Sequence, residues 1–250
     1  MRTCRFELSP AYAHLEEFCK NITQEFAQSN ATIHRARNEL KTLHVKGESL
    51  VVKSFKVPKG VQKWVYSFWK NSKAKTSYLN GLFLQEKGIC TPQPIGYVEF
   101  YEGKILKESY FIAQEWKYDF TVREPLLEEN FPNKEAIFKA FAHLVHTLHT
   151  HHITHKDLSP GNVLIRREGL KMCVVDINRM SFSPLSTSQK LANFSKLWAK
   201  DGDLKSIISH YATLAGLDPA QAYATALAAS HRLKAKINFK KRLRGVKVVD

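Results

Sequence analysis

The chain has 250 residues, with a hydrophobic content of 44% and an aromatic content of 11%, values typical of a globular protein that buries its own core. It contains no stretch of about 18 consecutive apolar residues and its N-terminus lacks an apolar signal segment, so we expect neither a transmembrane helix nor secretion. The four cysteines form no CxxC pair and are expected to be reduced thiols, which favours a cytoplasmic protein.

The formal net charge of +15 predicts attraction to polyanions such as a nucleotide, a nucleic acid or an anionic membrane. The alternative is that the charge serves solubility alone. We expect no nucleic-acid partner, because no nucleic-acid-binding motif is recognisable. The basic segment from Lys236 to Asp250 is interpreted either as a peripheral contact with a membrane surface or as a solvated end.

The N-terminal part of the chain is predicted to combine strands with two helices. In chain order the elements are a helix at Tyr12–Gln28, strands at Ile33–Val45 and Leu50–Phe55 around Lys46-Gly47, a helix at Ser72–Lys87, and strands at Ile95–Tyr101 and Tyr110–Gln114 around Glu102-Gly103. Gly88 follows the second helix and suits the left-handed residue that ends a helix. The hairpins predict a small antiparallel sheet.

The C-terminal part is predicted to be mostly helical. Its elements are a helix at Asn133–His152 with Asn133 as N-cap, strands at Val163–Ile165 and Leu170–Val175, and helices at Leu191–Trp198, Leu204–Tyr211 and Pro219–Arg232. This order predicts an α+β, protein-kinase-like fold: one domain over residues 1–250, with a small antiparallel N-lobe (1–115) and a reduced, mostly helical C-lobe (116–250). A nucleotide is expected in the crease between the lobes.

The motif HKDLSPGNVLI at His155–Ile165 is the strongest functional signal. Asp157 is followed by Asn162, and an apolar run then ends at Asp176. This spacing is typical of the catalytic loop and the metal-binding Asp of kinase-like phosphotransferases. Asp157 is the candidate catalytic carboxylate, and Asn162 and Asp176 offer the oxygen ligands that Mg²⁺ prefers. The alternative, a polar turn between a helix and a strand, leaves Asp176 unexplained.

Lys53 lies in the apolar strand LVVKSF and is the candidate ligand of the ATP phosphates. A solvent-facing lysine on an edge strand is the alternative interpretation. Such a lysine ordinarily pairs with a Glu of the next helix. Here that helix offers Glu86 near its end, or Ser77 and Asn80 as replacements, so the sequence does not assign the partner.

Three further positions are candidates for binding ATP. Glu115 follows the strand YFIAQ, where a hinge would meet adenine through backbone groups. Lys156 stands next to the catalytic Asp and could neutralise the transferred phosphoryl group. The segment HRARNEL from His34 to Leu40 would cover the phosphates but contains no glycine, so Arg35, Arg37 and Asn38 are alternative donors; an ordinary basic turn is equally consistent with it.

Histidines cluster before the motif. His143, His146 and His149 are spaced to share one side of a helix, which makes a zinc site conceivable, but no Cys or carboxylate completes a ligand set nearby. Ordinary surface and core histidines are the favoured interpretation. His155 is expected to be structural, with its ring supporting the loop and the strand that carries Asp176.

Over about residues 30–182 the chain resembles the bacterial lipopolysaccharide core sugar kinase family, the Kdo/heptose kinases with a protein-kinase-like fold. The segments that carry the resemblance are ARNELK, VVKSFKVP, SKAKTSY, EKGICTPQPIGY, HKDLSPGNVLI and VVDINRM. The catalytic motif is common to all kinase-like enzymes, so it is specific for fold and reaction only. The stretch from SKAKTSY to EKGICTPQPIGY points to this family.

The resemblance implies transfer of the γ-phosphate of ATP to a Kdo or heptose hydroxyl of the lipid A–core, an anionic glycolipid, at the cytoplasmic face of the inner membrane. It implies Asp157 as catalytic Asp, Asn162 and Asp176 as Mg²⁺ ligands, and Lys53 as phosphate lysine. Ile177-Asn178-Arg179 replaces the Phe-Gly of protein kinases and no A-P-E follows, which argues against protein substrates. The alternatives are another small-molecule or protein kinase on the same fold, and a non-catalytic pseudokinase.

Overall fold

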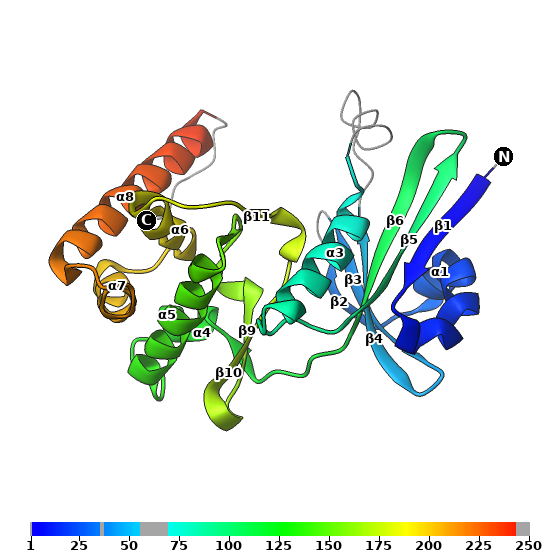
Figure 1. Ribbon diagram of the computed structural model, residues 1–250, viewed down its shortest axis with the longest axis horizontal. Coiled ribbons are helices and arrows are strands. Elements are labelled where there is room, and N and C mark those ends of the chain that lie inside the picture. The colour runs from blue at the N-terminus through cyan, green and yellow to red at the C-terminus, as the bar shows by residue number, and fades with distance from the viewer. Residues whose placement is uncertain (1, 36–37, 56–69, 244–250) are drawn as a thin grey trace. The chain divides into compact units, whose positions relative to one another are not determined.

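The computed structural model describes residues 2–35, 38–55 and 70–243. The chain divides into two compact units, Met1–Lys117 and Tyr118–Asp250, called here the first and the second unit. The division falls after residue 117, where the sequence placed it after residue 115. The first unit is built on an antiparallel sheet and the second is mostly helical, which confirms the predicted α+β class (Figure 1).

A six-stranded antiparallel sheet in the order β1-β5-β6-β4-β3-β2 forms the first unit. Its strands are β1 (Arg2–Leu8), β2 (Thr32–Arg35), β3 (Glu39–Val45), β4 (Glu48–Phe55), β5 (Pro94–Glu102) and β6 (Ile105–Gln114). The single strand expected at Ile33–Val45 is two strands, because the chain reverses between Arg35 and Glu39, which pair with each other. The two expected hairpins, β3–β4 and β5–β6, are both present.

Helices cover both faces of this sheet, and Figure 1 shows α1 and α3 on opposite sides of it. Helix α1 (Glu16–Gln28) follows a short 3-10 turn at Pro10–Leu15, and α3 is Lys73–Glu86. Because side chains alternate along a strand, β4 sends Leu50 and Val52 into the core beneath α1 and Phe55 into the cluster beneath α3. Lys53 therefore points to the α3 side of the sheet.

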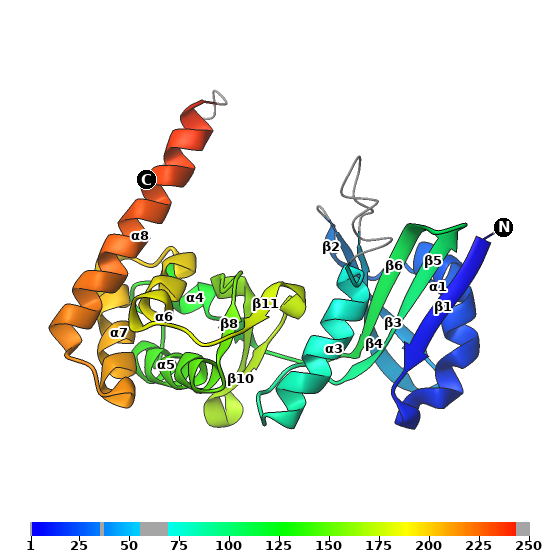
Figure 2. The same cartoon turned by 45° about the horizontal axis from the view of Figure 1, so that its top comes forward.

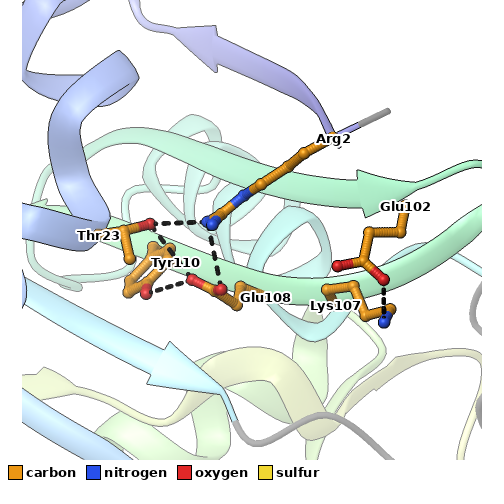
Figure 3. A network of polar contacts seen from close by, with 6 residues as sticks. All are labelled: Arg2, Thr23, Glu102, Lys107, Glu108 and Tyr110. Atoms are coloured by element: carbon orange, nitrogen blue, oxygen red, sulfur yellow. Dashed lines mark hydrogen bonds and ion pairs between the residues drawn. The ribbon is translucent and has the colours of Figure 1, made fainter.

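The N-terminal strand β1 was not expected from the sequence, because its residues are mostly exposed and show little apolar alternation. Pairing with β5 and a polar network hold it in place (Figure 3). Arg2 donates to Glu108 and to the Thr23 hydroxyl, both at 3.2 Å, and its guanidinium lies 4.4 Å from the Phe100 ring centroid. Tyr110 donates to the same Glu108 carboxylate at 2.9 Å, so this network links β1, α1 and β6.

The described residues of the second unit, 118–243, form five α-helices and short strands. The helices are α4 (Arg123–Leu127), α5 (Lys134–Thr150), α6 (Thr187–Asn193), α7 (Asp201–Ala215) and α8 (Pro219–Arg242). The strands are β7 (Phe120–Thr121), β8 (Ile153–His155), β9 (Val163–Arg166), β10 (Lys171–Val174) and β11 (Met180–Phe182). They form the sheets β10-β9-β7 and β11-β8, and α7 packs against both α5 and α8.

Three helix ends differ from the sequence prediction. Asn133 precedes α5 but has a left-handed backbone (φ 57°) and its side chain makes no cap hydrogen bond. Helix α6 begins early because Ser186 and Gln189 form a capping box, and a 3-10 turn at Phe194–Leu197 follows it. Helix α8 extends to Arg242, into the basic segment. Gly88 has the expected left-handed backbone (φ 68°).

In the described part of the chain, no helix combines the length and the hydropathy needed to span a bilayer.

Candidate active site

The loops that carry Asp157 and Asp176 are joined by backbone hydrogen bonds. Strand β8 leads into the first loop and β11 leaves the second, and these strands pair with His155 opposite Met180. The Lys156 amide continues the ladder by donating to Arg179 O at 3.0 Å. The Val175 amide donates to Asn162 O at 3.0 Å, so the residue before Asp176 is fixed to Asn162.

The imidazole of His155 forms a second connection between these loops. The Asp157 amide donates to its Nδ1 at 3.2 Å, and Nε2 lies 2.9 Å from Val175 O. An amide can only donate and a carbonyl can only accept, so Nδ1 carries no proton and Nε2 donates. The ring is therefore neutral, and burial lowers the pKa of His155 from its usual value, in agreement with that state. The expected structural role of His155 fits this geometry.

Asp157 is a half-exposed carboxylate whose backbone is anchored on both sides. Its carbonyl accepts from the Ser159 amide at 2.7 Å and from Asn162 Nδ2 at 2.8 Å. Its Oδ2 lies 3.2 Å from Nη1 of Arg179, a cation supplied by the loop after Asp176. The carboxylate is thus oriented by one exposed arginine and remains accessible.

Asp176 adopts a left-handed backbone (φ 57°, ψ 43°), a conformation in which non-glycine residues are uncommon outside Asn and Asp. Its Oδ1 accepts from Asn178 Nδ2 at 2.6 Å. The same turn leads into the short 3-10 helix Ile177–Arg179, which returns Arg179 to Asp157. The local strain of Asp176 is typical of functional positions.

Arg123, the first residue of α4, lies over the catalytic loop. A Cβ atom built on Gly161 would lie 3.0 Å from Nη2 of Arg123. The start of α4 is fixed by Glu124, whose Oε2 accepts from the Thr121 amide at 2.8 Å and from its hydroxyl at 2.7 Å. Gly161 therefore allows a cationic side chain to approach the loop between Asp157 and Asn162.

The predicted ATP-binding residues divide between the units. Lys156 is exposed beside Asp157 in the second unit, whereas Lys53 and Glu115 belong to the first. Lys53 stands opposite Leu40 and Phe111 in the sheet, and its Nζ lies 5.3 Å from the Phe55 ring centroid. The alternative interpretation placed Lys53 on an edge strand facing solvent. Its edge position is wrong, because β4 lies between β6 and β3 in the sheet.

Glu115 lies just after β6 and is bound to β4. Its amide donates to Ser49 O at 2.8 Å, and its carboxylate accepts from the Ser49 hydroxyl at 2.6 Å. The backbone amide and the side chain are thus already engaged within the first unit. Of the backbone groups of Glu115, the carbonyl is the one suited to meet an adenine.

Two of the three candidates for the Lys53 partner, Glu86 and Ser77, have contacts with other residues. Glu86 pairs with Lys87 at 2.8 Å and its side chain is 66% exposed. The Ser77 hydroxyl donates to Lys73 O within α3 at 2.8 Å. Asn80 is buried on the same helix. Of the expected phosphate-covering residues, Arg37 and the Arg35 side chain lie outside the described residues.

Of the three clustered histidines, His149 is buried in the core, His146 is half-buried and His143 is exposed. The Nδ1 of His149 lies 2.8 Å from the Tyr211 hydroxyl and its Nε2 lies 3.3 Å from Asn193 Oδ1, so both ring nitrogens are engaged by protein atoms. Among residues 2–35, 38–55 and 70–243, no group of three or more His, Cys, Asp or Glu side chains is arranged to hold a metal ion.

Sequence reasoning missed the contacts of Arg179, Asn178, Arg123 and Asn193. Arg179 and Asn178 were noted as departures from the protein-kinase pattern, and their position directly after Asp176 was the available signal. Arg123 and Asn193 are distant from the motif in sequence and approach it through α4 and α6, for which no sequence pattern provides a signal.

Comparisons with known proteins agree with this geometry. The model of the lipopolysaccharide kinase (Kdo/WaaP) family matches residues 84–204, a segment that contains Asp157, Asn162 and Asp176. The solved structure of WaaP in complex with acyl carrier protein has a TM-score of 0.62 to this chain at 16% identity, and covers 92% of this chain and 99% of that one. At this identity the likeness shows the fold. No curated protein matches the chain in sequence.

Proposed function

We propose that the chain is a member of the lipopolysaccharide kinase (Kdo/WaaP) family, whose model matches residues 84–204, and that it transfers the γ-phosphate of Mg·ATP to a Kdo or heptose hydroxyl of the lipid A–core. Members of this family are phosphotransferases with an alcohol group as acceptor, and so is this chain. The observation that carries the proposal is the connection of the Asp157 and Asp176 loops through His155.

Asp157 is the proposed catalytic residue. Its half-exposed carboxylate accepts or orients the proton of the acceptor hydroxyl, as the Asp of a kinase catalytic loop does. The Asn162 amide and the Ser159 amide hold its carbonyl, so the direction of the side chain follows from a fixed backbone. Arg179 at 3.2 Å restricts the rotation of this carboxylate.

Asn162 and Asp176 have the chemistry of a Mg²⁺ site. The side-chain Nδ2 of Asn162 donates a hydrogen bond to Asp157 O, so the side-chain oxygen of Asn162 points away from that carbonyl. Asp176 adds a carboxylate, and two protein oxygens suffice because Mg²⁺ takes its remaining ligands from water and phosphates. When bound, the ion supplies charge neutralisation at the phosphate oxygens. Asn178 orients the Asp176 carboxylate.

For ATP itself we propose three contacts. Lys53 binds the α- and β-phosphates from the α3 side of the sheet, and the Glu115 carbonyl meets the adenine amino group. Lys156, exposed next to Asp157, neutralises the transferred phosphoryl group. Glu115 supports its contact with a carbonyl that the hydrogen bonds to Ser49 do not use, and Lys156 supports its contact with an exposed ammonium.

The acceptor is an anionic glycolipid, which is consistent with the cations around the catalytic loop. Arg123 beside Gly161 and Arg179 beside Asp157 provide guanidinium groups suited to phosphate or carboxylate groups of the lipid A–core. The net charge of +15 attracts the same ligand over a longer range.

The end of α8 is the proposed contact with the cytoplasmic face of the inner membrane. Figure 2 shows this helix continuing past α6 and α7. Phe239 and Leu243, one helical turn apart, are 63% and 71% exposed. Lys236 and Lys240 are exposed on the same stretch. An exposed apolar pair among cations suits an anionic lipid surface, so vesicles with phosphatidylglycerol should bind the protein, and Phe239→Ser with Leu243→Ser should reduce the binding.

An acyl carrier protein is a proposed additional partner, because the similar solved structure contains one and the positive charge of this chain favours an acidic protein. Co-elution of the two proteins at low salt, lost at high salt, supports this partner. Separate elution at low salt argues against it.

The central experiment incubates the protein with labelled ATP and purified lipid A–core. We expect label in the glycolipid with the wild type and essentially none with Asp157→Asn. Asp201→Asn is a matched control, because Asp201 is an exposed carboxylate of α7 that contacts His231. Mass spectrometry then identifies the sugar. Full transfer by Asp157→Asn contradicts the mechanism, and ATP binding without transfer to any acceptor favours the pseudokinase.

A further inference from the structure

A chain of buried hydrogen bonds leads from helix α7 to the peptide before Lys156. The Tyr211 hydroxyl lies 2.8 Å from His149 Nδ1, and His149 Nε2 lies 3.3 Å from Asn193 Oδ1. Asn193 Nδ2 then donates to His155 O at 3.0 Å. Tyr211, His149 and Asn193, called here the relay, come from α7, α5 and α6 and are between 1% and 8% exposed.

The direction of every bond in the relay follows from one backbone group. The His155 carbonyl can only accept, so the group of Asn193 that faces it is the amide nitrogen. The amide oxygen of Asn193 then faces His149, so His149 Nε2 must donate to it. In the neutral ring Nδ1 is therefore an acceptor, and the Tyr211 hydroxyl donates to it. The relay is fully satisfied in one arrangement only.

Aromatic packing leaves the relay little freedom. The Phe194 ring lies 5.0 Å from the Tyr211 ring and 6.3 Å from the His149 ring, between centroids, and both pairs are edge-to-face. His149 and Tyr211 also contact each other edge-to-face at 5.6 Å. A buried and satisfied polar network of this kind fixes one conformation of its surroundings.

The relay ends on the carbonyl of His155, the residue that joins the two catalytic loops. Asn193 holds the His155 carbonyl, and the His155 ring accepts from the Asp157 amide and donates to Val175 O, next to Asp176. A rotation of the His155 peptide would therefore shift both carboxylates. The relay reaches Asp157 and Asp176 without contact to either side chain.

We propose that Asn193, oriented by His149 and Tyr211, is a positioning residue for phosphoryl transfer that sets the geometry of Asp157 and Asp176 through His155. This inference rests on the proposed function for its kinetic consequence. Its structural consequence, the protection of the Asp157 amide, is independent of any activity.

The test compares Asn193→Asp, Tyr211→Phe and the control Ser195→Ala. Asn193→Asp keeps the acceptor for His149 and removes the donor to His155 O, and Tyr211→Phe removes the outermost bond while keeping the ring. Ser195 is buried two residues after Asn193, but its hydroxyl donates to Ala192 O, three residues earlier in the chain, at 2.7 Å. All variants are measured at a temperature at which circular dichroism shows them folded.

We expect kcat to fall by about 10- to 100-fold in Asn193→Asp and by less in Tyr211→Phe, with the KM for the acceptor changed by less than about two-fold. Hydrogen exchange of the Asp157 amide should be faster in both variants and unchanged in Ser195→Ala. Exchange and kcat equal to those of Ser195→Ala overturn the proposal. Transfer that survives in Asp157→Asn contradicts the proposed function instead, and the exchange rates still decide the positioning role.

Discussion

The guanidinium of Arg179 lies 3.2 Å from the carboxylate of Asp157, and both side chains face solvent to a substantial degree, at 65% and 36% exposure. The pairing brings the residue three positions after Asp176 back to the catalytic loop. An exposed ion pair of this kind contributes about 1 kcal/mol or less to stability. Its significance therefore lies in the orientation of Asp157.

Replacing Arg179 should affect catalysis more than folding. For Arg179→Gln we expect kcat to fall by about 10-fold, because Asp157 loses its orienting cation. The midpoint of urea unfolding should change by the equivalent of about 1 kcal/mol at most. Arg179→Lys should recover part of the activity. Steady-state kinetics that show wild-type kcat in Arg179→Gln would contradict the orienting role.

Two substitutions of Asp176 should separate the effect of its left-handed backbone on stability from the effect of its carboxylate on activity. Asn tolerates the left-handed backbone at this position, so Asp176→Asn should unfold at nearly the wild-type urea concentration. Asp176→Ala should lose about 1 kcal/mol of stability in addition, because alanine is strained there. Both variants should lose transfer activity and the dependence of ATP affinity on Mg²⁺. Isothermal titration with ATP at several Mg²⁺ concentrations checks this expectation, and wild-type Mg²⁺ dependence in Asp176→Asn removes Asp176 from the metal site.

Gly161 and Arg123 should be energetically coupled. The methyl group of Gly161→Ala would lie 3.0 Å from Arg123 Nη2, so the guanidinium must move away from the loop. We expect kcat/KM for the glycolipid to fall by about 10-fold in Gly161→Ala and in Arg123→Ala, and the double variant to lose little more. A double-mutant cycle measures this coupling. Losses that multiply in the double variant show that the two residues act independently.

Stability should decline in weak acid because buried histidines are neutral in the fold. Burial lowers the pKa of His149 from 6.5 to about 4. The unfolded chain therefore takes up a proton first, and the contribution of roughly 3 kcal/mol is present above about pH 6.5 and is lost as the pH falls towards 4. Burial also lowers the pKa of His155, which acts in the same direction.

Urea unfolding at about pH 7 and about pH 5 measures this dependence. The difference in the free energy of unfolding between the two pH values should be smaller in His149→Gln, because the glutamine side chain takes up no proton in this range. His231→Gln is the matched control, because this histidine is exposed and contacts Asp201 at the surface. An equal difference in the wild type and in His149→Gln would show that other groups cause the loss of stability in acid.

The sequence by itself determined the α+β class, the hairpins β3–β4 and β5–β6, the long helix α5, and the identity of the candidate carboxylates Asp157 and Asp176. These features depend on local patterns: hydrophobic alternation, turn residues, and the short spacing within HKDLSPGNVLI. The relative positions of Asp157 and Asn162 follow from a single turn of chain. Local spacing was sufficient for these assignments.

Only the tertiary structure decided which side chains support the catalytic loops. Arg123, Asn193 and Tyr211 reach them through hydrogen bonds and close approaches from three separate helices, and such contacts leave no periodic signal in the chain. Strand β1 was missed for the same reason, since pairing with β5 and the Arg2 network stabilise a segment that has little strand character of its own. The direction of each buried hydrogen bond was likewise fixed by its partner in space.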